Sequence, residues 1–327
     1  MRAMILAAGY GTRLWPLTAD RTKPAIPFLG KPLVGYVAQY LAGHGIDEVI
    51  VNLHHRPESV REALGDGSRF GVKLSYVEEP VILGTSGALD NARHLLGDET
   101  FVVVNGKIVT DIDLTEAIKT HRQTNALATL VLLPNPAREA FSVVETRDGL
   151  VTEFGGMPGK TGDDTKQEVP LMFTGIQIME PGIFDYIPRG VFSHSTSDVY
   201  PQAMAKGERI AAHVAAGMWY ELSTIPRYLE ISLRLLAKQG RDVDAGESCE
   251  IGNGATVSES ILWDRVVVED GARVHHSILA DGVRIKSGEV VENSAIVLAS
   301  LVENEEPPAK ALKGEIKGDN FVVPLTR

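Results

Sequence analysis

Cysteine, long apolar runs and surplus positive charge are all scarce in this chain. Its only cysteine is Cys249, so an internal disulfide is impossible, and no apolar run approaches the roughly 18 residues that cross a bilayer. Lysine and arginine total 32 against 43 aspartates and glutamates, which gives a formal net charge of -11. This balance excludes a basic surface for a nucleic-acid backbone or an anionic membrane. We expect a protein of the reducing cytoplasm that binds any phosphate through local contacts.

The composition is that of an ordinary globular protein. Of the 327 residues, 44% are hydrophobic and 23% are charged, which excludes a disordered or collagen-like chain. The apolar stretch after Arg2 reaches a glycine at Gly9, too soon for a signal peptide, and is interpreted as a first β-strand.

Apolar runs alternate with segments of helical period through the first two-thirds of the chain. This alternation is typical of an α/β protein with a mostly parallel sheet covered by helices. The predicted strands are Met4–Ala7, Val49–Leu53, Leu74–Val77, Phe101–Asn105, Ala128–Leu133 and Met172–Ile178. The predicted helices are Leu33–Leu41, Ser86–Leu96, Leu114–Arg122 and Pro226–Gln239, the last ending at Gly240.

A different period begins after residue 240. Four columns recur three times at a spacing of 17 residues, namely Ile251/Val268/Ile285, Gly254/Gly271/Gly288, Val257/Val274/Val291 and Ser260/Ser277/Ser294. Branched apolar residues with glycine corners at a fixed repeat predict a parallel β-helix of about three coils. A small β-sandwich is the alternative, but sandwiches alternate without a fixed repeat. The expected division is therefore residues 1–240, 241–300 and a tail at 301–327.

The tail is polar before one short apolar run, Phe321–Leu325. Because a β-helix leaves its coil ends and strand edges exposed, it needs a cap from a tail or from another chain. We therefore expect that the apolar run docks on the last coil and that the chain forms a homo-oligomer through the β-helix.

The first strand ends in Leu-Ala-Ala and leads into GYGTRLWPLTADRTKP. Gly9 and Gly11 let backbone N–H groups turn toward an anion, and Arg13 adds a cationic fork. A dinucleotide fingerprint would need a third glycine where Leu14 stands, and the Gly-Lys-Ser/Thr of a P-loop is absent. Such a loop suits a polyphosphate, although two glycines and an arginine also occur in plain turns.

The whole string LAAGYGTRLWPLTADRTKPAIPFLGKP closely resembles the signature of the sugar-1-phosphate nucleotidyltransferases, the NDP-sugar pyrophosphorylases. Later segments are similar to that family in the same order: EEPVILGTSGAL, which is of the guanylyl type found in mannose-1-phosphate guanylyltransferases, then VVNGKIVTDIDL, FTGIQIM and GMWYELST. The resemblance spans residues 1 to about 297. It implies a Rossmann-like mixed, mostly parallel sheet followed by a short left-handed parallel β-helix.

In that family a sugar-1-phosphate oxygen attacks the α-phosphorus of a nucleoside triphosphate, and pyrophosphate leaves with the help of Mg²⁺ held by two aspartates. By resemblance, Arg13 stabilises the leaving pyrophosphate and Lys23 holds the reacting phosphates. The implied nucleotide-binding residues are Leu6, Ala7, Ala8, Gly9, Gly11, Thr12, Glu79, Gly84, Thr85, Ser86 and Gly87, with the Glu79 carboxylate suited to guanine N–H donors. The implied sugar-binding residues are Asn105, Gly106, Thr174 and Gly175.

The sequence departs from the family pattern around the metal and the sugar phosphate. Lys107 stands where the family has its first metal aspartate, and Glu221 replaces the second. Gly156 and Met157 replace a glutamate and a lysine that grip the sugar and its phosphate, and Ser142 replaces a glycine. A lysine cannot coordinate Mg²⁺ while protonated, so the metal requirement is open.

Two hypotheses follow from these changes. In the first, the Lys107 ammonium pairs with Glu221 and replaces part of the metal charge, so the chain remains an enzyme that favours GTP and a hexose or heptose 1-phosphate. In the second, the chain is a catalytically impaired paralogue that binds nucleotide or nucleotide sugar as a regulatory or scaffold subunit. Asp111 is a spare carboxylate for a metal, but we expect it to cap the helix that begins near Leu114.

Overall fold

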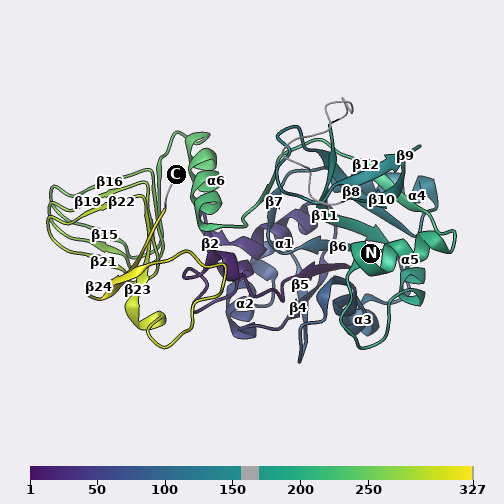
Figure 1. The fold of residues 1–327 in the computed structure, drawn as a ribbon, viewed down its shortest axis with the longest axis horizontal. Coiled ribbons are helices and arrows are strands. Elements are labelled where there is room, and N and C mark those ends of the chain that lie inside the picture. Colours follow the sequence, from purple (N-terminus) through teal and green to yellow (C-terminus); the bar gives the residue numbers. More distant parts are fainter. Residues whose placement is uncertain (156–168, 326–327) are drawn as a thin grey trace. The chain divides into compact units, whose positions relative to one another are not determined.

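The computed structural model describes residues 1–155 and 169–325, which form two compact units (Figure 1). The first unit contains Met1–Gly9, Val34–Pro57 and Leu64–Trp219. The second contains Tyr10–Leu33, Glu58–Ala63 and the chain from Tyr220 onward. Because each unit combines segments distant in sequence, the units do not test the division at residue 240, which stays a prediction.

The first unit is built on one mixed sheet. In the described part of the chain its nine strands, in spatial order, are β5 (Lys73–Glu78), β4 (Glu48–Leu53), β1 (Ala3–Leu6), β6 (Phe101–Asn105), β11 (Leu171–Met179), β8 (Ala128–Pro134), β12 (Ile210–Val214), β10 (Leu150–Phe154) and β9 (Val144–Arg147). All six predicted strands are present, with ends within one residue of the prediction. The prediction missed β9, β10 and β12 of this sheet. It also missed the short strands β2 (Pro27–Phe28), β3 (Lys31–Pro32), β7 (Ile108–Thr110) and β13 (Trp219–Glu221).

Strand direction follows a pattern that the sequence does not reveal. Strands β5, β4, β1 and β6 are parallel, as are β8 and β12. Strand β11 runs antiparallel between β6 and β8. A buried strand has the same continuous apolar pattern whether it is parallel or antiparallel to its neighbours, so the pattern does not indicate its direction.

Helices form where the 3.6-residue period predicts them. The helices are α1 (Leu33–Gly43), α2 (Pro57–Leu64), α3 (Gly84–Leu96), α4 (Leu114–Thr124), α5 (Tyr200–Ala205) and α6 (Ile225–Ala237). Helix α3 packs on β1, β4 and β5, and α4 packs on β8, β11 and β12. The predicted helices are confirmed within two residues at each end, whereas α2 and α5 were missed.

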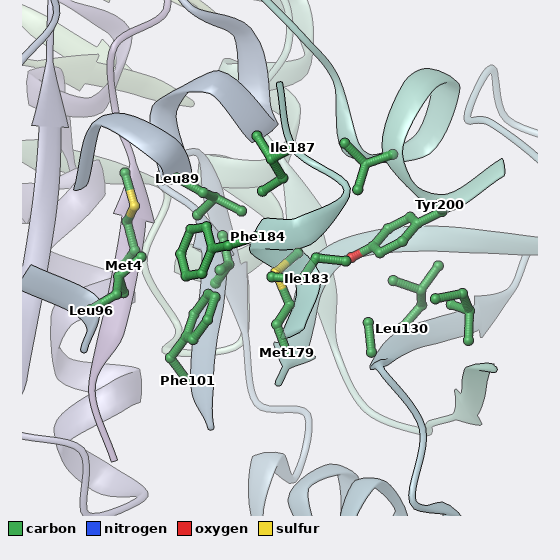
Figure 2. Packing of buried hydrophobic residues seen from close by; sticks show 14 of the residues in the cluster. Met4, Leu89, Leu96, Phe101, Leu130, Met179, Ile183, Phe184, Ile187 and Tyr200 are labelled. Carbon is green, nitrogen blue, oxygen red and sulfur yellow. The ribbon is translucent and has the colours of Figure 1, made fainter. Parts of the chain in front are cut away.

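One apolar core holds the sheet of the first unit together (Figure 2). Phe101 of β6 stacks on Phe184 with ring centroids 5.7 Å apart. Met4, Leu89 and Leu96 are at most 1% exposed. Burying each such side chain is worth about 1.5–3 kcal/mol, which keeps the strand ends in a defined position.

The 17-residue repeat of the second unit forms three parallel sheets. Two of them are β15 (Glu250–Ile251), β18 (Val267–Val268) and β21 (Arg284–Ile285), and β16 (Thr256–Ser258), β19 (Arg273–His275) and β22 (Val290–Glu292). The third contains β14 (Val243–Ala245), β17 (Ser260–Leu262), β20 (Ile278–Leu279) and β23 (Ser294–Leu298). The predicted columns pair directly, as Ile251 with Val268 and Val268 with Ile285. The parallel β-helix is confirmed.

The serine column ties successive coils together. The backbone N–H of Ser277 donates to Ser260 Oγ, and that of Ser294 donates to Ser277 Oγ, each at 3.1 Å. The glycine column supplies the corners, since Gly254, Gly271 and Gly288 have φ between 68° and 70°. A side chain would be strained in that left-handed region, which explains why glycine recurs.

The predicted docking of the tail is confirmed. Strands β24 (Glu315–Lys317) and β25 (Asn320–Pro324) extend the third sheet, with β25 antiparallel to β23 of the last coil. The tail therefore covers one edge of the last coil, whereas β21 and β22 end their own sheets in the described part of the chain. The homo-oligomer stays a prediction, because the tail removes only part of the exposed edge that motivated it.

Deletion of the chain after Gly318 should lower the melting temperature and promote aggregation. The deletion uncovers the β23 edge and removes Val323, which is fully buried. Differential scanning calorimetry and size-exclusion chromatography would measure both effects. Glu315→Gln, an exposed change on β24, is the matched control. A soluble truncation with an unchanged melting temperature would show that the tail does not stabilise the coil.

Candidate functional site

The order of the parallel strands reverses at one point of the first unit's sheet. From β1 the chain continues to β4 and β5 on one side, and then crosses to β6 on the other side of β1. In open α/β sheets, ligands bind at the carboxyl ends of the strands where the order reverses. Here that point lies between Leu6, which ends β1, and Asn105, which ends β6. The N–H of Gly106 donates to the Leu6 carbonyl at 2.9 Å, so predicted nucleotide and sugar residues are neighbours.

Asn52, which the sequence reasoning missed, organises this edge. Its Oδ1 accepts from the N–H of Ala7 at 2.7 Å, and its Nδ2 donates to Glu79 Oε1 at 2.5 Å. The other Glu79 oxygen accepts from the N–H of Leu83 at 2.9 Å. Asn52 and Glu79 are 2% and 3% exposed, so these bonds satisfy buried polar groups. The available signal was an asparagine near the end of an otherwise apolar strand.

The glycines at the start of α3 allow close backbone contacts. A Cβ on Gly84, whose φ is 75°, would lie 2.5 Å from the Ser193 carbonyl oxygen, and one on Gly87 would lie 2.6 Å from that of Val191. The N–H of Ser86 donates to the Ser193 carbonyl at 3.0 Å. Gly84, Ser86 and Gly87 thus pack against the segment that contains Val191 and Ser193. Contact of a nucleotide with these residues and with Thr85 stays a prediction.

A bulge in β11 brings the predicted sugar residues together. Thr174, 1% exposed, donates from Oγ1 to the Val131 carbonyl at 2.7 Å and accepts from the N–H of Ile176 at 3.3 Å. Gly175 has φ of 80°, and a Cβ there would overlap the side chain of Asn105. Asn105 and the bulge therefore lie in contact, as their shared predicted role requires.

The predicted cap of α4 is wrong by two residues. Asp113, not Asp111, caps the helix, because its side chain accepts from the backbone N–H groups of Thr115 and Glu116. Asp111 instead accepts from the N–H of Met218 at 2.5 Å and stabilises the segment before β13. Both aspartates precede Leu114, and only the backbone path decides which one reaches the helix N-terminus.

The cationic residues of the signature loop converge on one carboxylate inside the second unit. Lys23 is 7% exposed, and its Nζ lies 3.8 Å from Glu221 Oε1. Arg13 Nη2 lies 3.9 Å from the same oxygen, with half of the Arg13 side chain exposed. Burial of an ammonium is costly unless a counter-ion is near, which gives Glu221 its structural role. Both distances exceed hydrogen-bond length, so these are ion pairs without a direct hydrogen bond to that oxygen.

Gly11 is required where the loop crosses Lys23. Its φ is 68°, and a Cβ on it would lie 2.9 Å from Lys23 Cβ. The next residue, Thr12, begins a short 3-10 turn that ends at Leu14. The loop therefore brings Gly11 against Lys23, while the phosphate contacts implied for Gly11, Thr12 and Lys23 stay a prediction.

The residues at the expected metal positions do not fit a Mg²⁺ site held by the protein. Mg²⁺ prefers oxygen ligands, but Lys107, partly buried in the turn after β6, offers an ammonium. Asp111 already accepts a backbone hydrogen bond, and Glu221 lies beside two cations. In residues 1–155 and 169–325, no cluster of three or more histidine, cysteine, aspartate or glutamate side chains could hold a metal.

Two predicted departures cannot be placed. Gly156 and Met157 lie outside the described residues. Ser142 is exposed and lines a cavity of about 700 Å³ in the first unit together with residues of β10, among them Thr152 and Glu153. The lining of this cavity is mixed, since Phe154 and Met204 contribute apolar surface beside these polar side chains.

A glycine-rich cationic loop after the first strand and a reversal of strand order in a parallel sheet are each typical of nucleotide-binding α/β proteins. The nucleotidyl transferase family matches residues 2–238, and the GlmU-like C-terminal hexapeptide family matches residues 241–305. The chain therefore belongs to the nucleotidyl transferase family, and it is an enzyme of the sugar-1-phosphate nucleotidyltransferase type.

Relatives within this family differ in nucleotide and sugar. A UTP–glucose-1-phosphate uridylyltransferase of Synechocystis is 32% identical over 82% of this chain and 72% of its own length. An N-acetylmuramate alpha-1-phosphate uridylyltransferase of Neisseria meningitidis is 35% identical over 70% and 96%. A mannose-1-phosphate guanylyltransferase of Mycobacterium tuberculosis is 31% identical over 82% and 81%.

One similar solved structure agrees with the fold. It is a putative glucose-1-phosphate thymidylyltransferase from Bacillus anthracis, with a TM-score of 0.60 and 22% identity, and the match covers 76% of this chain and 98% of that one. Among the described residues, no helix is both long and apolar enough to cross a membrane.

Proposed function

We propose that this chain transfers a nucleotidyl group from a nucleoside triphosphate to a sugar 1-phosphate, giving an NDP-sugar and pyrophosphate. The observation that carries the proposal is that two cations of the signature loop, the buried Lys23 and the half-exposed Arg13, converge on Glu221 of β13. Two cations held beside each other form a site for phosphate groups, whose charge changes most during such a transfer.

The reaction needs positioning and charge stabilisation more than proton transfer. A sugar-phosphate oxygen, already an anion, attacks the α-phosphorus, a P–O bond forms, and the bond to the β-phosphate oxygen breaks. In the proposal, Lys23 binds the reacting phosphates and Arg13 binds the departing pyrophosphate. Lys107 supplies a fixed positive charge at the end of β6, where a metal-binding aspartate would otherwise stand.

No step of this mechanism requires a metal held by protein carboxylates. The family generally uses a divalent metal, and a metal that arrives with the triphosphate belongs to that substrate. A cytoplasmic location also stays a prediction from the sequence.

For the substrates, we propose GTP and a hexose or heptose 1-phosphate. The choice of GTP is supported by the guanylyl-type segment that contains Glu79 and Gly84–Gly87, and by relatives that are mannose-1-phosphate guanylyltransferases. UTP is the competing nucleotide, because two similar relatives are uridylyltransferases.

Pyrophosphate release from a panel of four nucleoside triphosphates and several sugar 1-phosphates tests the proposal. We expect release with GTP and one sugar 1-phosphate, and loss of release in Arg13→Ala. Thermal shift with each nucleotide is measured in parallel. If no pair releases pyrophosphate while a nucleotide still raises the melting temperature, the catalytic proposal fails and the impaired, nucleotide-binding paralogue replaces it.

A further inference from the structure

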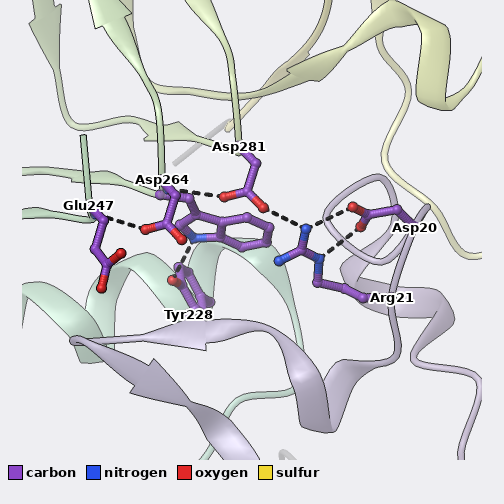
Figure 3. Close-up of polar contacts among 7 residues, drawn as sticks. Asp20, Arg21, Tyr228, Glu247, Asp264 and Asp281 are labelled. Carbon is purple, nitrogen blue, oxygen red and sulfur yellow. Dashed lines mark hydrogen bonds and ion pairs between the residues drawn. The ribbon is translucent and has the colours of Figure 1, made fainter. Parts of the chain in front are cut away.

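Arg21, two residues before Lys23, joins the signature loop to the β-helix within the second unit (Figure 3). Its Nη2 donates to Asp281 Oδ2 at 2.6 Å and to Asp20 Oδ2 at 2.7 Å, and its Nε donates to Asp20 Oδ1 at 2.8 Å. Its guanidinium also lies over the ring of Trp263, 5.1 Å from the centroid. One side chain thus contacts the loop and two places on the coil.

The coil residue that holds Arg21 is itself held by the coil below it. Asp281 Oδ1 accepts from the N–H of Asp264 at 3.0 Å, and Asp264 Oδ1 accepts from the N–H of Glu247 at 2.8 Å. These three acidic residues recur every 17 residues, one in each coil. Because the carboxylates of Asp281 and Asp264 each accept from the backbone of the preceding coil, Asp281 is anchored to the β-helix.

A second connection reaches the loop on the other side of Lys23. Trp263 Nε1 donates to the hydroxyl of Tyr228 at 3.1 Å, and that hydroxyl donates to the Pro27 carbonyl at 2.7 Å. Trp263 is 3% exposed and Tyr228 is fully buried, so both bonds are shielded from water. Arg21 and Pro27 therefore fix the chain before and after Lys23.

We propose that the β-helix positions Lys23 for phosphate binding through Arg21, which makes Arg21 a positioning residue of the reaction. This inference rests on the proposed function, because Lys23 acts there as the phosphate ligand. A phosphate site needs its cation held in one place, and Lys23 lies in a loop of short 3-10 turns rather than in a long helix or strand. The contacts of Arg21 with the coil add support to that loop.

An arginine is chemically required for this connection. Burial would lower the pKa of the Arg21 guanidinium, but the hydrogen bonds and charges of Asp20 and Asp281 raise it above its ordinary value. The planar fork contacts two carboxylates while its face covers an indole, which a lysine ammonium cannot reproduce. Arg21→Lys should therefore keep the positive charge but retain only part of the support that Arg21 gives to the loop.

Asp281→Asn is the sharpest test. It removes the charge facing Arg21 but keeps an oxygen that can accept from Asp264, so the coil should still fold. We expect kcat/KM to fall about 10- to 100-fold, as for a misplaced reacting group, and the Kd for the triphosphate to rise. Arg21→Ala should show a comparable loss, and Arg21→Lys an intermediate one. Arg284→Ala, which breaks the 2.8 Å coil ion pair with Glu269, is the matched control and should leave both constants unchanged.

Hydrogen exchange of peptides spanning residues 20–28 separates this inference from the proposed function. Faster exchange in Asp281→Asn than in Arg284→Ala, together with weaker triphosphate binding by calorimetry, supports the coupling even if no substrate pair releases pyrophosphate. Unchanged exchange would overturn it. Faster exchange with unchanged triphosphate affinity and unchanged kcat/KM would also overturn it, because the loop would then move without consequence for phosphate binding.

Discussion

Replacement of Lys23 by methionine is expected to reduce kcat/KM for pyrophosphate release by about 100- to 1,000-fold, as when one preorganised donor to a developing charge is removed. Methionine keeps the length and the apolar stem of the lysine, which is 7% exposed. Only the ammonium near Glu221 is lost. Because that charge acts most strongly in the transition state, kcat should fall more than KM rises.

The melting temperature should fall moderately in the same variant, because the buried Glu221 carboxylate loses one of its two cationic neighbours. Arg13 still lies 3.9 Å from Glu221 Oε1 and should keep the chain folded. Lys31→Met, a lysine-to-methionine change on the β3 hairpin of the same loop, is the matched control and should retain wild-type activity. An unchanged kcat/KM in Lys23→Met would remove Lys23 from the phosphate site. A collapsed melting temperature would instead assign it a structural role.

Replacement of Lys107 is expected to have the next largest effect. Lys107→Ala should lower kcat about 100-fold, because a fixed positive charge at the end of β6 is lost. Lys107→Asp restores the carboxylate that the family signature carries at this position, so its activity should depend strictly on added Mg²⁺. Asn105 and Gly106, which precede Lys107, remain unchanged in both variants.

Pyrophosphate release with and without a chelator measures this effect. The unmodified chain should retain measurable release in the chelator, whereas Lys107→Asp should lose it and regain it on addition of Mg²⁺. Complete loss of release from the unmodified chain under the chelator would contradict the role given to Lys107. Lys119→Asp, on the exposed face of α4, is the control and should behave as the unmodified chain does.

Local patterns predicted much of the fold because they reflect short-range physics. The 17-residue columns predicted the register of the coils, in which Val257 pairs with Val274 and Val274 with Val291. The apolar runs predicted six strands, because a buried strand requires a continuous apolar segment. The glycine at position 11 indicated a turn in the signature loop, and in the structure Gly11 has a φ of 68° and lies against Lys23.

Contacts between distant segments could not be predicted in this way. The sequence contained no sign that β11 is antiparallel between β6 and β8, that Asn52 joins Ala7 to Glu79, or that Asp113 rather than Asp111 caps α4. Each depends on the path of the backbone in space, where a shift of one or two residues exchanges one polar partner for another.

Periodicity and glycine placement are local properties, so sequence was enough for the class of fold, the β-helix and the expectation that the first loop binds phosphate. The support of that loop depends on contacts between distant segments, which became visible only in the folded chain. Arg21 and Asp281 are 260 residues apart in the chain, yet their side chains meet at 2.6 Å. An ion pair at that separation forms only when the folded backbone brings both charges together, and no spacing or composition records it.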